Sequence, residues 1–329
     1  MKKNITLKIL VLLILILNNS CNKDNIDPKR VNILKKFNKV NKQIFELDTI
    51  EFKQIIGEKG TKIYFNRELF DIKENDRITF ELKEFYDFED LVFNDLRTIT
   101  HKNEILKSKG VIYADFFVNN ERVNLKKGKK IRIDFPDNKL ENNDIYLGKI
   151  DSLNQISWIE QKRDSLCEVV LYIGGGISKR ITTTTDSIKY YEKQNKLILR
   201  KEKIFRENNK RLNSSILTAK IGWINIDKII DKLDKVSFKI ELVEKEFDNL
   251  QIVCLFDNSF SFKTFYRTKD NLNFKDLPYI KDITSIVVFG FENENIFCDK
   301  IYIKNNVNSE FKVDLKKANE KEIIELLKK

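Results

Sequence analysis

This chain of 329 residues has few histidines and cysteines, the residue types that most often act in catalysis or metal binding, and few prolines and glycines. It contains one histidine, four cysteines, three prolines and ten glycines. Because a Ser–His–Asp or Cys–His site needs an imidazole, any such site would have to use His101, which lies where a solvent-facing turn is expected. No GxSxG motif is present, so the sequence has no nucleophile elbow. The sequence therefore favours a non-enzymatic protein, and it indicates no catalytic residue and no cofactor.

Metal-ligand spacings are missing as well. None of Cys21, Cys167, Cys254 and Cys298 belongs to a CxxC motif or to a His/Cys cluster, and no DxDxDG-type calcium loop occurs. No metal site is therefore expected. Cys254 and Cys298 both lie in strand patterns near the C-terminus. A disulfide across a sandwich is one interpretation, and two small buried apolar residues are the favoured one.

Two stretches resemble phosphate-binding or polyanion-binding sequences. The glycine run Gly174–Gly176 is followed neither by GK[ST] nor by a helical pattern, which favours a turn over a phosphate-binding loop. The lysine-rich run Lys126–Lys130 lies between two strand patterns. A solvated hairpin turn is favoured there over a patch for phosphate or anionic surfaces. Elsewhere Lys and Asp/Glu are interspersed, so no nucleic-acid partner is expected.

The longest apolar run is short. Ile9–Leu17 is far below the roughly 20 residues that cross a bilayer core, and Lys2, Lys3 and Lys8 precede or flank it. A basic start followed by a short apolar core is typical of a secretory signal. The next residues end in Ser20 and Cys21, which resembles a bacterial lipobox.

The sequence therefore predicts a lipoprotein signal peptide over residues 1–20 and acylation of Cys21 as the mature N-terminus. Two or three acyl chains would attach the protein to a membrane, because each buried methylene contributes about 0.8 kcal/mol. An ordinary cleaved signal with a free thiol is the alternative. The expected location is the cell envelope, at the outer membrane, on either its periplasmic or its surface face. Removal of the signal lowers the formal net charge from +11 to +8.

Period-two alternation dominates the rest of the chain. It is clear in Ile78–Leu82, Ile131–Phe135 and Val236–Leu242, and it is typical of antiparallel strands with one solvated face. Tyr86–Leu96 instead has helical spacing and predicts a short helix. Asn319, followed by Glu322, predicts a capping box and a C-terminal helix. The expected fold class is mainly β, with two β-sandwich-like domains and a few short helices.

The expected domain organisation has four parts after the signal peptide. Residues 21–48 are predicted to be a tether with a short docking helix, or alternatively an amphipathic helix on the membrane surface. Residues 49–140 are expected to form the first β-sandwich. Residues 141–215 are expected to be an irregular β region and linker. Residues 216–329 carry strand signals every 10 to 15 residues or so, which suggests an immunoglobulin-like sandwich with a C-terminal helix.

Three groups of stretches resemble a family of Bacteroidetes secreted proteins and lipoproteins of undetermined biochemical role. They are Gly57–Ile63 with Leu96–Thr100 and Ile105–Gly110; Ile145–Gly148 with Ile156–Trp158; and Gly222–Lys228. The N-terminal β-domain of that family is similar to ZU5-type modules, and its central signature is Gly-Trp-Ile-Asn-Cys-Asp-Arg. Here Ile226 and Lys228 replace its cysteine and arginine. The resemblance implies a ZU5-like first domain and envelope placement, and it carries no catalytic residues.

Three function classes remain open. The main hypothesis is a lipid-anchored envelope protein with a structural, adhesive or assembly role and an envelope protein or glycan as partner. The alternative is a carbohydrate- or peptide-binding lipoprotein of an uptake system, in which Trp158, Tyr190 and Tyr191 would form a stacking platform. A hydrolase of envelope polymers is third, since paired carboxylates can come from distant positions.

Overall fold

A computed structural model describes residues 32–329 apart from several gaps. The gaps are residues 48–52, 74, 137–142, 153, 162–165, 175–176, 185–214, 232, 245–246, 248, 258–259, 269–270, 281–282, 304–308 and 329, and no side chain of 166–184 is described. The predicted signal peptide, Cys21, Tyr190 and Tyr191 therefore lie outside the described residues. Residues Asn32–Lys329 form one compact unit.

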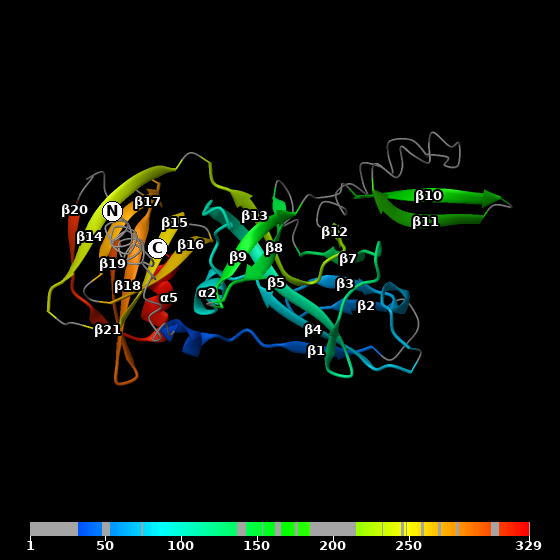
Figure 1. The fold of residues 1–329 in the computed structure, drawn as a ribbon, viewed down its shortest axis with the longest axis horizontal. Coiled ribbons are helices and arrows are strands. Elements are labelled where there is room, and N and C mark those ends of the chain that lie inside the picture. Colours follow the sequence, from blue (N-terminus) through cyan, green and yellow to red (C-terminus); the bar gives the residue numbers. More distant parts are fainter. Residues whose placement is uncertain are drawn as a thin grey trace, which may run out of the picture. The chain divides into compact units, whose positions relative to one another are not determined.

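The first sandwich consists of two sheets whose strands pair antiparallel (Figure 1). The larger sheet has the order β1 (Gln43–Glu46), β4 (Ile78–Phe85), β5 (Leu106–Val118), β13 (Gly222–Ile229), β8 (Asp144–Ile150) and β9 (Ile156–Gln161), with β6 (Glu121–Val123) paired to β5. The smaller sheet has the order β12 (Ser215–Thr218), β7 (Ile131–Asp134), β3 (Lys62–Phe65) and β2 (Lys53–Ile56). In the β5–β6 hairpin, Asn119 and Asn120 both have positive φ, as a type I′ turn requires.

The core of this sandwich follows from the alternation of its strands. Every second residue of β4 and β7 is buried, including Phe80 and Ile133, while the residues between them are more exposed except for Phe85 at the end of β4. Phe65, Phe80 and Phe116 meet here, with neighbouring ring centroids 4.6 to 5.8 Å apart. Burial of this apolar surface is the main stabilising contribution, at roughly 25 cal/mol per Å².

The second sandwich is built from the C-terminal strands. Its larger sheet has the order β16 (Ser261–Thr268), β15 (Asn249–Asp257), β18 (Ser285–Glu292), β19 (Asn295–Tyr302) and β21 (Lys316–Ala318). Its smaller sheet has the order β17 (Asn273–Tyr279), β14 (Asp234–Leu242) and β20 (Ser309–Val313), in which β14 and β20 run parallel. A separate antiparallel hairpin joins β10 (Leu166–Gly174) to β11 (Ile177–Thr184).

Helices are few and short in the described chain. They are the 3-10 helices η1 (Ile33–Phe37) and η2 (Arg67–Leu69) and the α-helices α2 (Phe88–Phe93) and α5 (Glu320–Lys328). The predicted capping box is present, because the backbone N–H of Glu322 donates to Asn319 Oδ1 and that of Asn319 donates to Glu322 Oε2. The mainly β fold class is thereby confirmed, with helices where Tyr86–Leu96 and the C-terminus predicted them.

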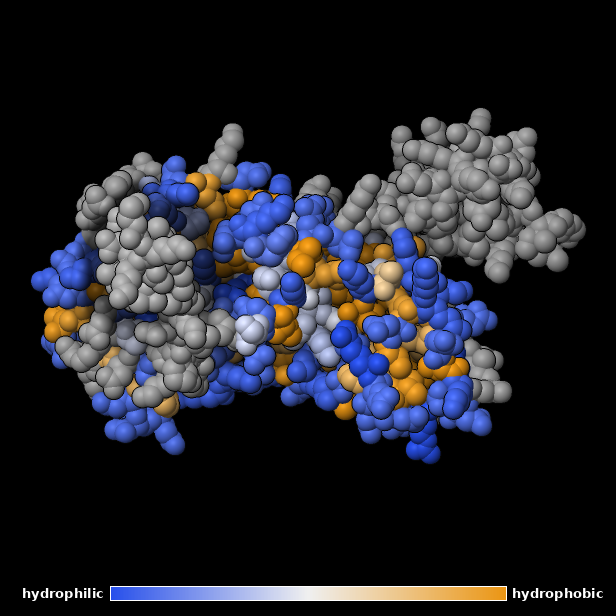
Figure 2. Space-filling model, in the orientation of Figure 1, coloured by the Kyte–Doolittle hydropathy of each residue, from blue (hydrophilic) through white to orange (hydrophobic). Residues whose placement is uncertain are grey.

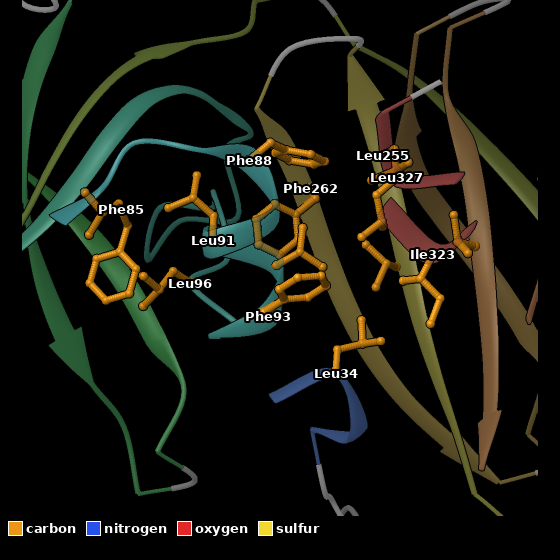
Figure 3. Close-up of a cluster of buried hydrophobic side chains, with 14 of the residues drawn as sticks. Leu34, Phe85, Phe88, Leu91, Phe93, Leu96, Leu255, Phe262, Ile323 and Leu327 are labelled. Atoms are coloured by element: carbon orange, nitrogen blue, oxygen red, sulfur yellow. The ribbon is translucent and has the colours of Figure 1, made fainter. Parts of the chain in front are cut away.

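A third hydrophobic core, which we call the joining core, connects the two sandwiches. It contains side chains of η1, α2 and α5 together with residues of both larger sheets. Figure 3 shows Phe93 and Phe262 next to each other, with Leu91 of α2 on one side of them and Leu255, Ile323 and Leu327 on the other. The larger sheet of the second sandwich is therefore buried on both faces, which explains why β15 and β18 read as continuous apolar runs.

Backbone hydrogen bonds also connect the two sandwiches. The N–H of Thr98 donates to the carbonyl of Phe262 at 3.2 Å, and the N–H of Ser108 donates to that of Phe260 at 3.0 Å. The Ser261 hydroxyl donates to the carbonyl of Leu106 at 2.8 Å. Thr98 and the first residues of β5 thus bond to the chain at the start of β16, and the two sandwiches share main-chain hydrogen bonds as well as a core.

Three expectations need correction. The expected domain border at 215/216 does not match the strand pairing, because β12 and β13 lie in the first sandwich and β13 pairs with β5 and β8. The amphipathic surface helix is excluded for η1, since Leu34 is fully buried in the joining core. Cys254 and Cys298 are free and buried, on opposite faces of one sheet, so the disulfide is absent.

Candidate functional site

A cleft of about 310 Å³ lies where η1, the β2–β3 turn, α2 and α5 meet. We call it the clasp cleft, and its lining residues are Phe37, Lys39, Val40, Asn41, Gln43, Glu58, Lys59, Glu84, Asp87, Glu89, Asp90, Phe93, Glu320 and Ile324. Four of these side chains are apolar, six are carboxylates, and lysines and amides supply the rest. Ten of the fourteen lining side chains are therefore polar or charged, whereas most sites for small ligands are predominantly apolar.

The apolar floor is held by the contact between η1 and α2. The rings of Phe37 and Phe93 lie 5.7 Å apart between centroids. The Asn32 amide donates to the carbonyl of Phe93, and the Asn94 amide donates to Asn38 Oδ1, both at 2.8 Å. These bonds fix the segment before β1 on the helix, so the floor is preformed.

Glu84 forms the deepest polar part of the clasp cleft. Its carboxylate is buried and accepts hydrogen bonds from the backbone N–H groups of Lys59 and Thr61 and from the Gln43 amide, at 2.8 to 2.9 Å. A Cβ added to Gly57 would lie 2.5 Å from Glu84 Oε2, so only glycine lets the turn approach this closely. Glu84 thereby ties β4 to the β2–β3 turn.

Lys59 bridges two further carboxylates. Its Nζ lies 2.6 Å from Asp87 Oδ2 and 2.7 Å from Asp90 Oδ2. Burial opposes the charged form of Lys59, but the hydrogen bonds and charges of Asp87 and Asp90 outweigh it and raise the pKa of the lysine. Burial likewise raises the pKa of Asp90, and the Lys59 ammonium opposes that shift.

Two more ion pairs close the rim of the clasp cleft. Lys39 pairs with Glu320 at 2.5 Å, and Lys328 pairs with Glu89 at 2.9 Å. Five of the six lining carboxylates are therefore engaged by lysines or by N–H donors, and Glu58 is the exposed remainder. This pairing favours a structural role for these acids over paired acid–base chemistry.

A second polar feature lies on the outer face of the larger sheet of the first sandwich, across β5, β8 and β13. We call it the buried polar centre, and it comprises Ser108, Tyr146, Asn225 and Asp227, all buried. The Ser108 hydroxyl donates to Asn225 Oδ1 at 3.1 Å, and the Asn225 amide donates to Asp227 Oδ2 at 2.6 Å. Asp227 Oδ1 and the Tyr146 hydroxyl have no hydrogen-bond partner among the described residues.

The buried polar centre coincides with the Gly222–Lys228 signature. Ile224 and Ile226 point into the sandwich core, so the alternation of the strand places Asn225 and Asp227 on the opposite face. Burial raises the pKa of Asp227 to about 7, although Ser108, Asn225 and the backbone N–H of Lys109 favour its ionised form. The signature therefore contains a carboxyl group whose charge changes near neutral pH.

The remaining sequence-predicted residues are dispersed. His101 is exposed in a turn, and Trp158 is fully buried with its indole N–H donating to the carbonyl of Arg97 at 2.6 Å. Trp158 therefore cannot belong to an exposed stacking platform. Gly174 ends β10 and Ile177 begins β11, and the predicted turn at Gly175 and Gly176 lies outside the described residues.

Both cysteines of the described core are free and buried. Burial raises the pKa of Cys254 and of Cys298 to about 12. Within the described ranges, no group of His, Cys, Asp and Glu side chains could hold a metal ion. None of the described helices is both long and apolar enough to span a bilayer.

Sequence reasoning did not identify the clasp cleft. Its lining comes from segments far apart in the chain, and each contributes ordinary charged or apolar residues. No protein-family model matches the chain, and no curated protein or solved structure shows significant similarity to it. The family resemblance therefore stays a prediction.

Proposed function

We propose that this chain is a lipid-anchored protein of the bacterial cell envelope with a non-enzymatic structural, adhesive or assembly role. The observation that carries the proposal is the run from Lys2 to Cys21, a basic start and short apolar core that end in a lipobox-like cysteine. Envelope placement also agrees with the resemblance to Bacteroidetes lipoproteins, which we retain as part of the proposal.

The architecture supports a structural role. A shared core and main-chain hydrogen bonds join the two sandwiches, which favours a stiff body over two freely hinged domains. The ion pairs of the clasp cleft add connections between α2, α5 and the N-terminal segment. Figure 2 shows mostly hydrophilic residues over one face of the described part, with separate apolar patches between them.

The anchor is tested by fatty-acid labelling and membrane fractionation of cells that express the wild-type chain or Cys21→Ala. We expect the wild type to incorporate a labelled fatty acid and to sediment with membranes, and Cys21→Ala to do neither. Cys298→Ala is the matched control, because its thiol is buried and burial raises its pKa. Equal labelling of Cys21→Ala and wild type would overturn the proposal. Protease treatment of intact cells then separates a surface from a periplasmic location.

The clasp cleft favours a second candidate, the carbohydrate- or peptide-binding lipoprotein. Asn41 lines the cleft and is exposed, so Asn41→Trp would fill the space without disturbing a core. A screen of oligosaccharides and short peptides by thermal shift provides the measurement. A ligand that stabilises the wild type and the exposed control Asn124→Trp, but not Asn41→Trp, identifies the cleft as its site. A ligand that stabilises all three proteins equally contradicts binding in the cleft.

A further inference from the structure

The turn between β6 and β7 concentrates positive charge on one exposed surface. Lys126, Lys127, Lys129 and Lys130 are all exposed. The N–H of Lys129 donates to the carbonyl of Lys126 at 2.9 Å, and Gly128 adopts φ +79°. The tight turn therefore places four lysines on one short stretch of the surface.

A fifth lysine reaches the same end of the sandwich from a distant part of the chain. β12 pairs with β7, and its last residue, Thr218, is opposite Ile131, which directly follows the turn. The Thr218 hydroxyl donates to the carbonyl of Lys220 at 2.7 Å and holds the chain there. Lys220 is exposed. We call these five side chains the lysine patch: Lys126, Lys127, Lys129, Lys130 and Lys220.

Four of the five lysines of the patch have no ion-pair partner among the described residues. Lys39, Lys42 and Lys239 each have a carboxylate oxygen within 2.6 Å. In contrast, Lys126, Lys127, Lys129 and Lys220 have no described carboxylate within 4 Å; the recorded ion pairs all involve other residues. The charges of Lys126, Lys127, Lys129 and Lys220 repel one another, and an anion with several charges would relieve that repulsion.

The side chains around the lysine patch limit the class of anion that it can bind. The large apolar side chains that are exposed in the described structure are Ile44, Ile56, Ile150, Ile159, Val243, Phe291 and Tyr302, and none belongs to the turn or adjoins Lys220. Surfaces that dock on membranes use such apolar side chains beside their lysines. Surfaces that hold single-stranded nucleic acids use aromatic ones.

We propose that the lysine patch binds an acidic polysaccharide through its repeated carboxylate, sulfate or phosphate groups. A flexible polyanion without acyl chains or flat bases needs several ammonium groups and no apolar partner, as the patch provides. The identification of this polymer as an envelope component rests on the proposed function. The binding itself is a property of the folded chain and is tested without cells.

The test measures binding of detergent-purified full-length protein to polygalacturonate and to neutral dextran at low and physiological salt. The patch variant carries glutamine at all five positions of the lysine patch. The matched control carries glutamine at five dispersed exposed lysines and so has the same net charge: Lys149, Lys228, Lys235, Lys275 and Lys312. Circular dichroism and melting confirm that both variants fold.

We expect the wild type and the dispersed control to bind polygalacturonate, and the patch variant to bind at least about tenfold more weakly. Binding should weaken as salt rises, and dextran should not bind. Equal losses in the two variants would overturn the proposal, because net charge alone would then explain binding. Binding to vesicles of phosphatidylglycerol but not to polygalacturonate would overturn it in favour of a lipid surface. If Cys21 proved not to be acylated while the protein still bound the polymer, the proposed function would be wrong. The binding proposal for the lysine patch would still be supported.

Discussion

At the scale of single residues, Asp227 has the clearest consequence for stability. Its folded-state pKa of about 7 exceeds its ordinary value of 3.8, so the folded state binds a proton that the unfolded state releases. The stability that this proton contributes is fully present below about pH 4 and is lost as the pH rises through 7. Three pKa units correspond to about 4 kcal/mol, an upper value for this change.

We therefore expect Asp227→Asn to be more stable than the wild type at pH 8, by about 1–3 kcal/mol, and the difference to shrink towards pH 5. The neutral amide keeps an acceptor for Asn225 and removes the buried charge. Denaturant unfolding at the two pH values measures this. Asp231→Asn, an exposed change close to the same strand, should show no such dependence. A loss of stability that is equal at both pH values would contradict the assignment.

At the scale of secondary-structure elements, the strands with one solvated face were predictable from their alternation. β4, β7 and β14 lie where Ile78, Ile131 and Val236 begin alternating patterns. Local rules were sufficient because each such strand places one face on a single core. The position of β13 was not predictable, since its partners β5 and β8 are set by long-range packing. The clasp cleft was not predictable either, because long-range packing also brings its lining residues together.

The capping box of α5 gives a prediction at this scale. Asn319 and Glu322 exchange hydrogen bonds at the start of a nine-residue helix, and Ile323 and Leu327 of that helix are buried in the joining core. We expect Asn319→Ala to lower the free energy of unfolding by about 1 kcal/mol. Glu325→Ala is the control, because Glu325 is exposed on the same helix and lies outside the capping box.

A double-mutant cycle with Glu322→Ala distinguishes the reciprocal cap from separate effects. The two changes should lose less stability together than the sum of their single losses, because each removes part of the same pair of hydrogen bonds. Additive losses would show that Asn319 and Glu322 act independently. The same measurement with Glu325→Ala should give additivity.

At the scale of the whole molecule, the joining core makes the two sandwiches cooperative. The composition and strand patterns predicted two separate β domains, and the observed sheet of the second is instead buried on both faces. The continuous apolar runs of β15 and β18 were the sequence signal, since a strand with a solvated face alternates. That signal does not indicate which element covers the second face of the sheet. In this structure α2, α5 and the first sandwich cover it.

Phe262 tests this cooperativity. Its ring contacts that of Phe88 edge-on, with centroids 5.6 Å apart, inside the joining core. Phe274 lies only in the core of the second sandwich, stacked on Phe238. Substitution of either residue by alanine should cost about 3–5 kcal/mol. Hydrogen exchange at the amides of Phe80 in β4 and Ile252 in β15 reports the opening of each sandwich.

In the wild type both amides should exchange with the same opening free energy, because each opens only by global unfolding. Phe274→Ala should lower both values together, since an intact joining core transmits the loss from the second sandwich to the first. Phe262→Ala weakens the joining core itself and should separate the two values, with Ile252 opening more readily than Phe80. Wild-type values that already differ by several kcal/mol would show that the sandwiches unfold independently, and the stiff body assumed for the structural role would then be wrong.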